Sequence, residues 1–107
     1  MSELARKTAS PISRELRAVL TIFSADAELR RKALPYVSIE RECIDWESIL
    51  QNDFGGGHSA AVLMARCIWM DRVPDGASDP FDRALAMDGW LRQKVHRALA
   101  IRWGLLD

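Results

Sequence analysis

The chain has 107 residues, of which 49% are hydrophobic, and its 15 basic and 15 acidic residues give a formal net charge of zero. The hydrophobic content excludes a disordered chain, and the length predicts a single domain with one core. The balanced charge argues against a general polyanion-binding protein, because such proteins carry a basic excess. We therefore expect one helical domain over residues 1–107, with residues 1–9 as a frayed lead-in.

The number of cysteines and the composition of residues 1–11 predict the cellular compartment. Cys43 and Cys67 are too few for a disulfide framework and form no CxxC pair. Residues 1–11 are polar and mixed in charge, which is unlike a secretory signal. The longest apolar run is well short of the about 20 residues that a membrane span needs. We therefore expect a cytoplasmic protein that makes no contact with a membrane.

Two helices are predicted in the first third of the chain. Ser10 is expected to cap the first, with Pro11 at its first position. Apolar residues then recur at helical spacing at Ile12, Leu16, Val19, Leu20 and Phe23. A shorter second helix is expected to start at Ser24 as its cap and to end before Pro35, since the residue before proline avoids helical angles.

Residues 36–44 are ambiguous. Their aromatic and β-branched members favour extended structure, yet the chain contains no second strand of similar strength. An isolated strand would leave its backbone groups unpaired, so we predict a loop or an irregular turn. Asp45 is then expected to cap a short helix from Trp46 to Gln51, and residues 55–57, three glycines, to end that helix and reverse the chain.

The apolar run that follows the glycines predicts the main helix. Only Arg66 is charged between residues 60 and 70. A helix that is apolar on nearly all sides has to be surrounded by other elements. We therefore predict a buried central helix over residues 58–71, inside an all-α, compact, irregular or orthogonal bundle of about six helices.

Two further helix starts follow an exposed loop at residues 73–78. Asp79 and Pro80 have the residue types of an N-cap and a first helical position. Asp88 is expected to cap the last helix, which runs over residues 89–103 and ends at Gly104.

The start of the predicted central helix is a candidate anion site. Backbone N–H groups of Gly56 and Gly57 at the positive end of a helix suit a phosphate or a carboxylate. The site would also use His58, Ser59 and Arg66. Against it, the segment lacks the lysine and the preceding strand of a phosphate-binding loop. The alternative is that the glycines only join two helices at a tight angle.

The last helix allows a nucleic-acid interpretation. Residues 80–87 and 89–103 would form a helix-turn-helix, whose second helix carries basic residues and one histidine at Arg92, Lys94, His96, Arg97 and Arg102. These side chains spread around the helix instead of forming one stripe, and Arg102 falls on the side predicted to face the core. Nucleic acid is therefore not the expected partner.

An apolar surface near residue 100 is the candidate interface. Trp90 and the stretch 101–106 supply apolar and aromatic side chains that a monomer has little reason to expose. The candidate interface residues are Trp90, Ile101, Trp103, Leu105 and Leu106. We expect a homo-oligomer or a complex with another protein.

No combination of residues predicts a catalytic or metal site. His58, His96, Cys43 and Cys67 are single residues without ligand spacing. We therefore expect no metal, no cofactor and no catalytic residues. By elimination, the sequence predicts a small non-catalytic protein–protein interaction or self-associating module. The alternatives are a small-anion or nucleotide-binding protein and a helix-turn-helix nucleic-acid binder.

Overall fold

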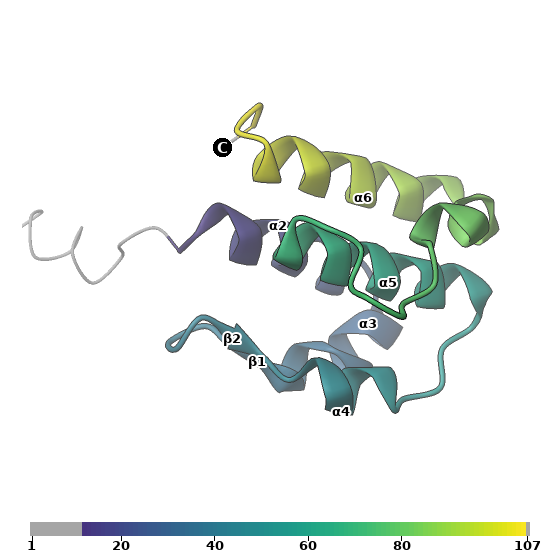
Figure 1. Cartoon of the computed structure of the whole chain (residues 1–107), viewed down its shortest axis with the longest axis horizontal. Coiled ribbons are helices and arrows are strands. Elements are labelled where there is room, and N and C mark those ends of the chain that lie inside the picture. Colours follow the sequence, from purple (N-terminus) through teal and green to yellow (C-terminus); the bar gives the residue numbers. More distant parts are fainter. Residues whose placement is uncertain (1–11, 107) are drawn as a thin grey trace, which may run out of the picture.

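The computed structural model describes residues 12–106, apart from the side chain of Arg83, and is mostly helical (Figure 1). The described part contains five α-helices, two 3₁₀ helices and one two-stranded hairpin, so the predicted helical class is confirmed, whereas a six-helix bundle is not. The elements are α2 (Arg14–Phe23), α3 (Ala27–Lys32), η1 (Leu34–Tyr36), β1 (Val37–Ser38), β2 (Cys43–Ile44), α4 (Trp46–Leu50), α5 (Gly56–Met70), η2 (Pro80–Ala86) and α6 (Gly89–Arg102).

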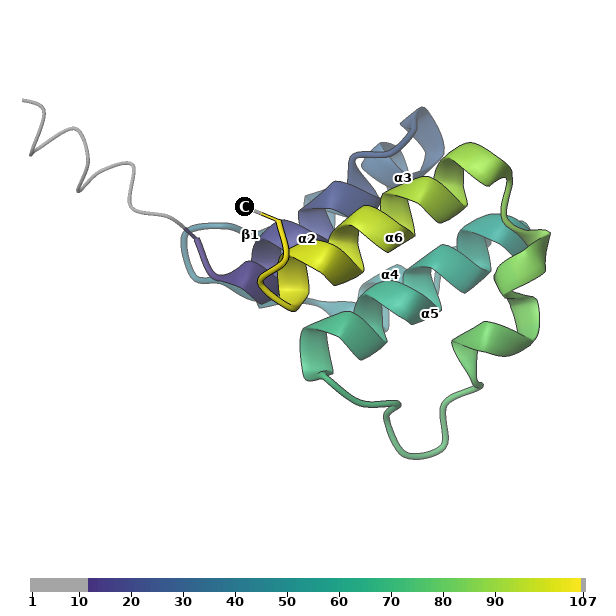
Figure 2. The same cartoon turned by 90° about the horizontal axis from the view of Figure 1, so that it is seen from above.

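Three helices, α2, α5 and α6, enclose the main core. α6 lies on one side of α2 and α5, and α3, the hairpin and α4 lie on the other (Figures 1 and 2). α2 contacts both α5 and α6. Half of its residues are completely buried, namely Leu16, Ala18, Val19, Ile22 and Phe23. The prediction of one central helix is therefore not confirmed, because α2 is enclosed at least as fully as α5.

The first two caps differ from the prediction. α2 begins after Ser13, whose Oγ accepts a hydrogen bond from the Leu16 amide at 3.2 Å, while Ser10 and Pro11 lie outside the described residues. α3 begins after Asp26, whose carboxylate accepts from the Leu29 amide. Ser24 instead ends α2, and its backbone angles of −93° and 2° are not the extended ones that an N-cap adopts.

Residues 36–44 contain a turn between two short paired strands, so the predicted loop or irregular turn is confirmed only for residues 39–42. The segment supplies both strands of a short antiparallel hairpin, in which Val37 pairs with Ile44 and Ser38 with Cys43. The backbone groups that seemed to lack a partner find one a few residues further along the same segment. The predicted cap at Asp45 is confirmed, since its carboxylate accepts from the Ser48 amide at 3.1 Å.

Two of the three glycines lie inside α5, and Gly55 is the N-cap residue directly before it. α4 ends at Leu50, a connection follows, and Gly56 and Gly57 form the first turn of α5, two residues earlier than predicted. A Cβ atom on Gly57 would come within 2.8 Å of the Ala86 carbonyl oxygen. Glycine is therefore required at position 57 because η2 crosses the start of α5 at very short distance.

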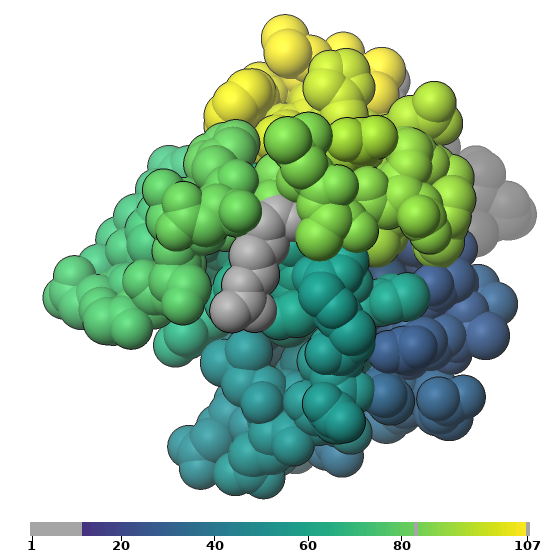
Figure 3. Space-filling model, turned by 90° about the vertical axis from the view of Figure 1, so that its right-hand side faces the viewer, coloured from purple at the N-terminus to yellow at the C-terminus, as the bar shows by residue number. Residues whose placement is uncertain are grey.

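The segment after α5 projects from the body of the molecule before it returns as η2 (Figures 2 and 3). Asp79 caps η2 as predicted, and its carboxylate accepts from the Phe81 amide at 2.9 Å, although the element is a 3₁₀ helix. α6 follows and ends before Gly104, which has a φ of +78°. None of the described helices is long and apolar enough to cross a membrane.

We predict that two neighbouring glycine substitutions have opposite effects on stability. Gly57→Ala should lower the free energy of unfolding by about 1–3 kcal/mol, because the backbone of η2 must move away from the new methyl group. Gly56→Ala meets only the Ala86 side chain, at an ordinary 3.8 Å, and should raise stability by up to about 1 kcal/mol. Urea denaturation of both variants measures the difference, and equal midpoints would contradict this account.

Candidate functional site

An open apolar groove lies between the second half of α5, η2 and the end of α6, and its volume is about 200 Å³. We call it the apolar groove. Most of its lining is hydrophobic or aromatic, with charged side chains only at a few positions: Met64, Cys67, Ile68, Asp71, Arg72, Val73, Pro80, Phe81, Leu99, Arg102 and Trp103.

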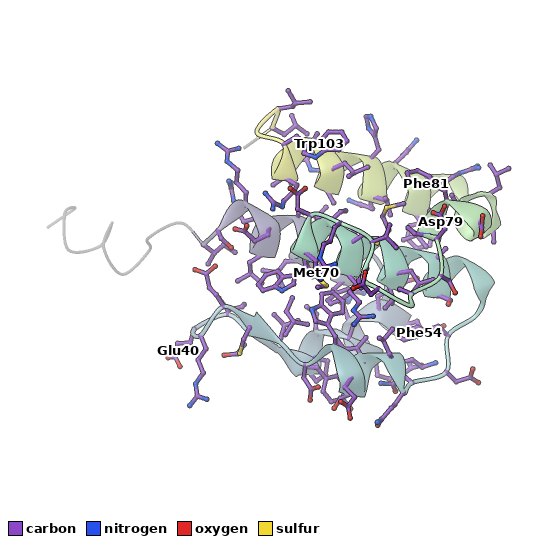
Figure 4. All side chains as sticks on the ribbon, viewed as in Figure 1. Glu40, Phe54, Met70, Asp79, Phe81 and Trp103 are labelled. Carbon is purple, nitrogen blue, oxygen red and sulfur yellow. The ribbon has the colours of Figure 1, made fainter. Side chains whose placement is uncertain are left out.

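Two aromatic side chains of the apolar groove are largely exposed. Phe81 keeps 70% of its surface accessible and Trp103 keeps 64%. Figure 4 shows Phe81 beside Asp79 and Trp103 at the far end of α6. Exposed aromatic residues beside an apolar depression are the usual anchors of a protein interface.

Rigid neighbours hold both ends of the apolar groove in place. At the end formed by η2, Pro80 is buried, and the contact of Gly57 with Ala86 fixes η2 against α5. At the other end, Arg102 Nε donates to the Ile68 carbonyl oxygen at 3.0 Å, and its Nη2 lies 3.6 Å from Glu15 Oε2. These contacts explain the arginine on the side of the last helix that faces the core, because its charge is partnered there.

Cys67 contributes a thiol to the lining, but not a reactive one. Burial raises the pKa of this thiol, and the nearby Asp79 carboxylate raises it further, against the opposing effect of Arg66. The thiol is therefore protonated near neutral pH, and a thiol is a poor nucleophile. This chemistry favours binding over covalent catalysis in the apolar groove.

The candidate interface residues do not all lie together. Trp103 lines the apolar groove, and Leu105 and Leu106 follow it on the surface, with Leu105 74% exposed. Trp90 is exposed at the beginning of α6, away from this end. Ile101 is only 4% exposed and belongs to the core, so its expected place on an interface is corrected. The helical periodicity places Ile101 on the side of the last helix opposite to its main apolar face, and α2 covers that side.

The candidate anion site at the start of α5 is surrounded by acidic groups. His58 Nε2 lies 2.5 Å from Asp26 Oδ2, and His58 Nδ1 lies 3.9 Å from Glu28 Oε2. A bound anion beside His58 would be repelled by these two carboxylates. Sequence reasoning missed Asp26 as the partner of His58, because the two residues are far apart along the chain.

Arg66 is not brought to this helix start. It lies ten residues after Gly56, which corresponds to about 15 Å along an α-helix. It is half-buried, and its Nε has no hydrogen-bond partner among the described residues. The anion hypothesis therefore lacks the cation that it assigned to the helix start formed by Gly56, Gly57 and Ser59.

The basic residues of α6 do not share one face. Lys94 and Arg97 point toward α2, where they line a second groove with Arg17. Arg102 is held on the other side of the helix by Ile68 and Glu15. The first element of the expected helix-turn-helix is the seven-residue 3₁₀ helix η2. This arrangement differs from the single exposed recognition face of that motif.

Comparisons with protein-family models, curated proteins and solved structures find no match to this chain. No relative therefore supplies a function by similarity.

The Asp26 carboxylate beside His58 has a pKa below its ordinary value. Burial would raise its pKa, but the Leu29 amide, the His58 ring and the Arg30 charge lower it below the ordinary value. A carboxyl whose pKa is lowered on folding stabilises the protein at pH values above its unfolded pKa. This contribution is lost as the pH falls through the folded pKa.

We predict a pH-dependent effect of Asp26→Asn. Asparagine also caps helices well, so the variant removes the charge and keeps the cap. It should unfold more easily than the wild type at pH 6, by up to about 1 kcal/mol. The difference should disappear as the pH is lowered through the depressed pKa of Asp26. Urea denaturation at a series of pH values between about 2.5 and about 7 measures this effect. The series includes pH values below and above the ordinary carboxyl pKa of about 4.

Glu40→Gln is the control for the pH series, because Glu40 is an exposed carboxylate in the turn of the hairpin. It should change the stability by less than about 0.5 kcal/mol at every pH. A constant difference between Asp26→Asn and the wild type down to the lowest pH would contradict the assignment.

Proposed function

We propose that this protein is a non-catalytic interaction module that self-associates through the apolar groove. The observation that carries the proposal is the pair of exposed aromatic side chains, Phe81 and Trp103, on an apolar depression with firmly held ends. Such a surface is costly to leave in water, and burying it stabilises a complex.

A second copy of the chain is the occupant that fits best. The groove has a volume of about 200 Å³, which suits one or two large apolar side chains. Leu105 and Leu106 are exposed two and three residues after Trp103, so the apolar groove and a candidate anchor lie at the same end of the molecule. In a two-fold dimer, each copy would place these leucines in the groove of the other, because such an interface uses the same surface twice.

The charge of the chain is compatible with self-association. A net charge of zero provides little long-range repulsion between copies. The groove itself carries charge of both signs at its edge, in Asp71 and Arg72. Arg72 already lies 3.7 Å from Asp75 within its own chain. Apolar contact, and not charge pairing, would therefore supply most of the affinity.

A non-catalytic role is supported by the chemistry of the lining. The thiol of Cys67 is kept protonated, and the two histidines of the chain are not among the residues that line the groove. Within residues 12–106, no group of three or more histidine, cysteine or acidic residues is arranged to hold a metal ion. The groove thus offers shape and apolar surface instead of a reacting group.

We predict that the wild type forms a dimer and that Phe81→Asp weakens it. Sedimentation velocity over a concentration series should show a mass that rises above 12.1 kDa toward twice this value. The charge of Phe81→Asp would be buried in the interface, so the dimer dissociation constant should rise by at least about tenfold. Far-UV circular dichroism should be unchanged, because Phe81 is exposed in the monomer.

Ile39→Asp is the matched control. Ile39 is also an exposed apolar residue, at 54%, but it lies in the turn of the hairpin and not in the groove. This variant should associate like the wild type. The proposal would fail if the wild type stayed monomeric at all concentrations, or if both variants weakened the dimer equally.

A further inference from the structure

A second groove lies between α2 and α6, on the side of α6 away from the apolar groove. Its volume is about 410 Å³, and we call it the basic groove. It is lined by three cationic, two hydroxyl-bearing and two apolar side chains, with no acidic residue: Arg17, Lys94, Arg97, Thr21, Ser24, Leu20 and Ile101.

The three cations come from two helices that are distant in sequence. Arg17 lies on α2, and Lys94 and Arg97 lie on α6. None of the three forms an ion pair with another residue in the part of the chain that the structure describes. Like charges that share a groove repel one another, and a bound anion would replace this repulsion with attraction.

Arg17 is the best-positioned of the three cations. It is half-buried, and its Nε is buried without a hydrogen-bond partner among residues 12–106. Packing of this kind restricts the side chain before a ligand arrives, so little conformational entropy remains to be lost on binding. Next to it, the Thr21 hydroxyl donates its proton to the Arg17 carbonyl oxygen at 2.9 Å, so the cations and not this hydroxyl would contact an anion in the groove.

We propose that the basic groove binds a polyphosphate anion, meaning two or three linked phosphate groups, either free or carried by a nucleotide. Two guanidinium groups and one ammonium match the charge of such a ligand, and guanidinium groups bind phosphate oxygens in pairs. The volume of about 410 Å³ corresponds to about 14 water molecules at about 30 Å³ each.

A compact anion fits this groove better than a nucleic acid does. The cations are confined to the space between two helices, and the chain as a whole has no net positive charge to attract an extended polyanion. The groove also differs from the start of α5, where carboxylates surround His58. The inference is independent of self-association, since the two grooves lie on different sides of α6.

Isothermal titration calorimetry with tripolyphosphate and with ATP, at constant ionic strength, tests the inference. The wild type should bind at least one of the two. The double variant Lys94→Gln, Arg97→Gln should bind at least about tenfold more weakly, because two of three charge-assisted contacts are lost. Both side chains are exposed, so the fold should persist. Arg92→Gln, a change at an exposed arginine of α6 outside the groove, should bind like the wild type.

The two ligands distinguish the two sources of phosphate. Equal affinities would identify a free polyphosphate as the ligand, and tighter binding of ATP would identify a nucleotide whose base contacts the apolar part of the lining. The inference would be overturned if neither ligand bound, if the double variant and Arg92→Gln behaved alike, or if only a DNA duplex bound.

Discussion

The arrangement of this molecule depends on one close approach, between Gly57 in the first turn of α5 and the Ala86 carbonyl oxygen at the end of η2. Because position 57 carries no Cβ, η2 can cross the start of α5 at van der Waals distance. This crossing sets the point from which α6 runs along α5 in the same direction, so that Arg102 at the end of α6 reaches Ile68 near the end of α5. It also places Pro80 and Phe81 in the wall of the apolar groove. The same glycine that suggested an anion site therefore has a packing role.

α6 is fixed at its other end by a charged side chain. Arg102 donates to the last part of α5 and lies near Glu15 of α2, so one guanidinium joins three helices. Between these two fixed points, α6 has an apolar groove on one side and a basic groove on the other. We propose a different role for each side, namely apolar contact with another chain at the apolar groove and binding of an anion at the basic groove.

Local signals in the sequence predicted what depends on neighbouring residues. The caps at Asp45 and Asp79 are local, because each carboxylate bonds an amide two or three residues later. The partner of His58 and the contact of Gly57 depend on residues brought together by folding, and no local pattern reveals them. The hairpin is local, but its strands have only two residues each, which is too short for an alternating pattern to be recognised. The sequence contained one further signal of a long-range contact, and it was interpreted only in part. A lone arginine on the apolar side of the last helix indicated a partnered charge, which proved to be Arg102 with Glu15.

Isotope-filtered nuclear Overhauser spectroscopy is the most direct test of the central claim, that two copies meet at the apolar groove. A mixture of labelled and unlabelled protein reports only contacts between different copies. The account predicts intermolecular contacts from the leucine methyl groups of residues 105–106 to the rings of Phe81 and Trp103. A dimer whose intermolecular contacts lay at the hairpin or at the start of α6, with none at these rings, would contradict it.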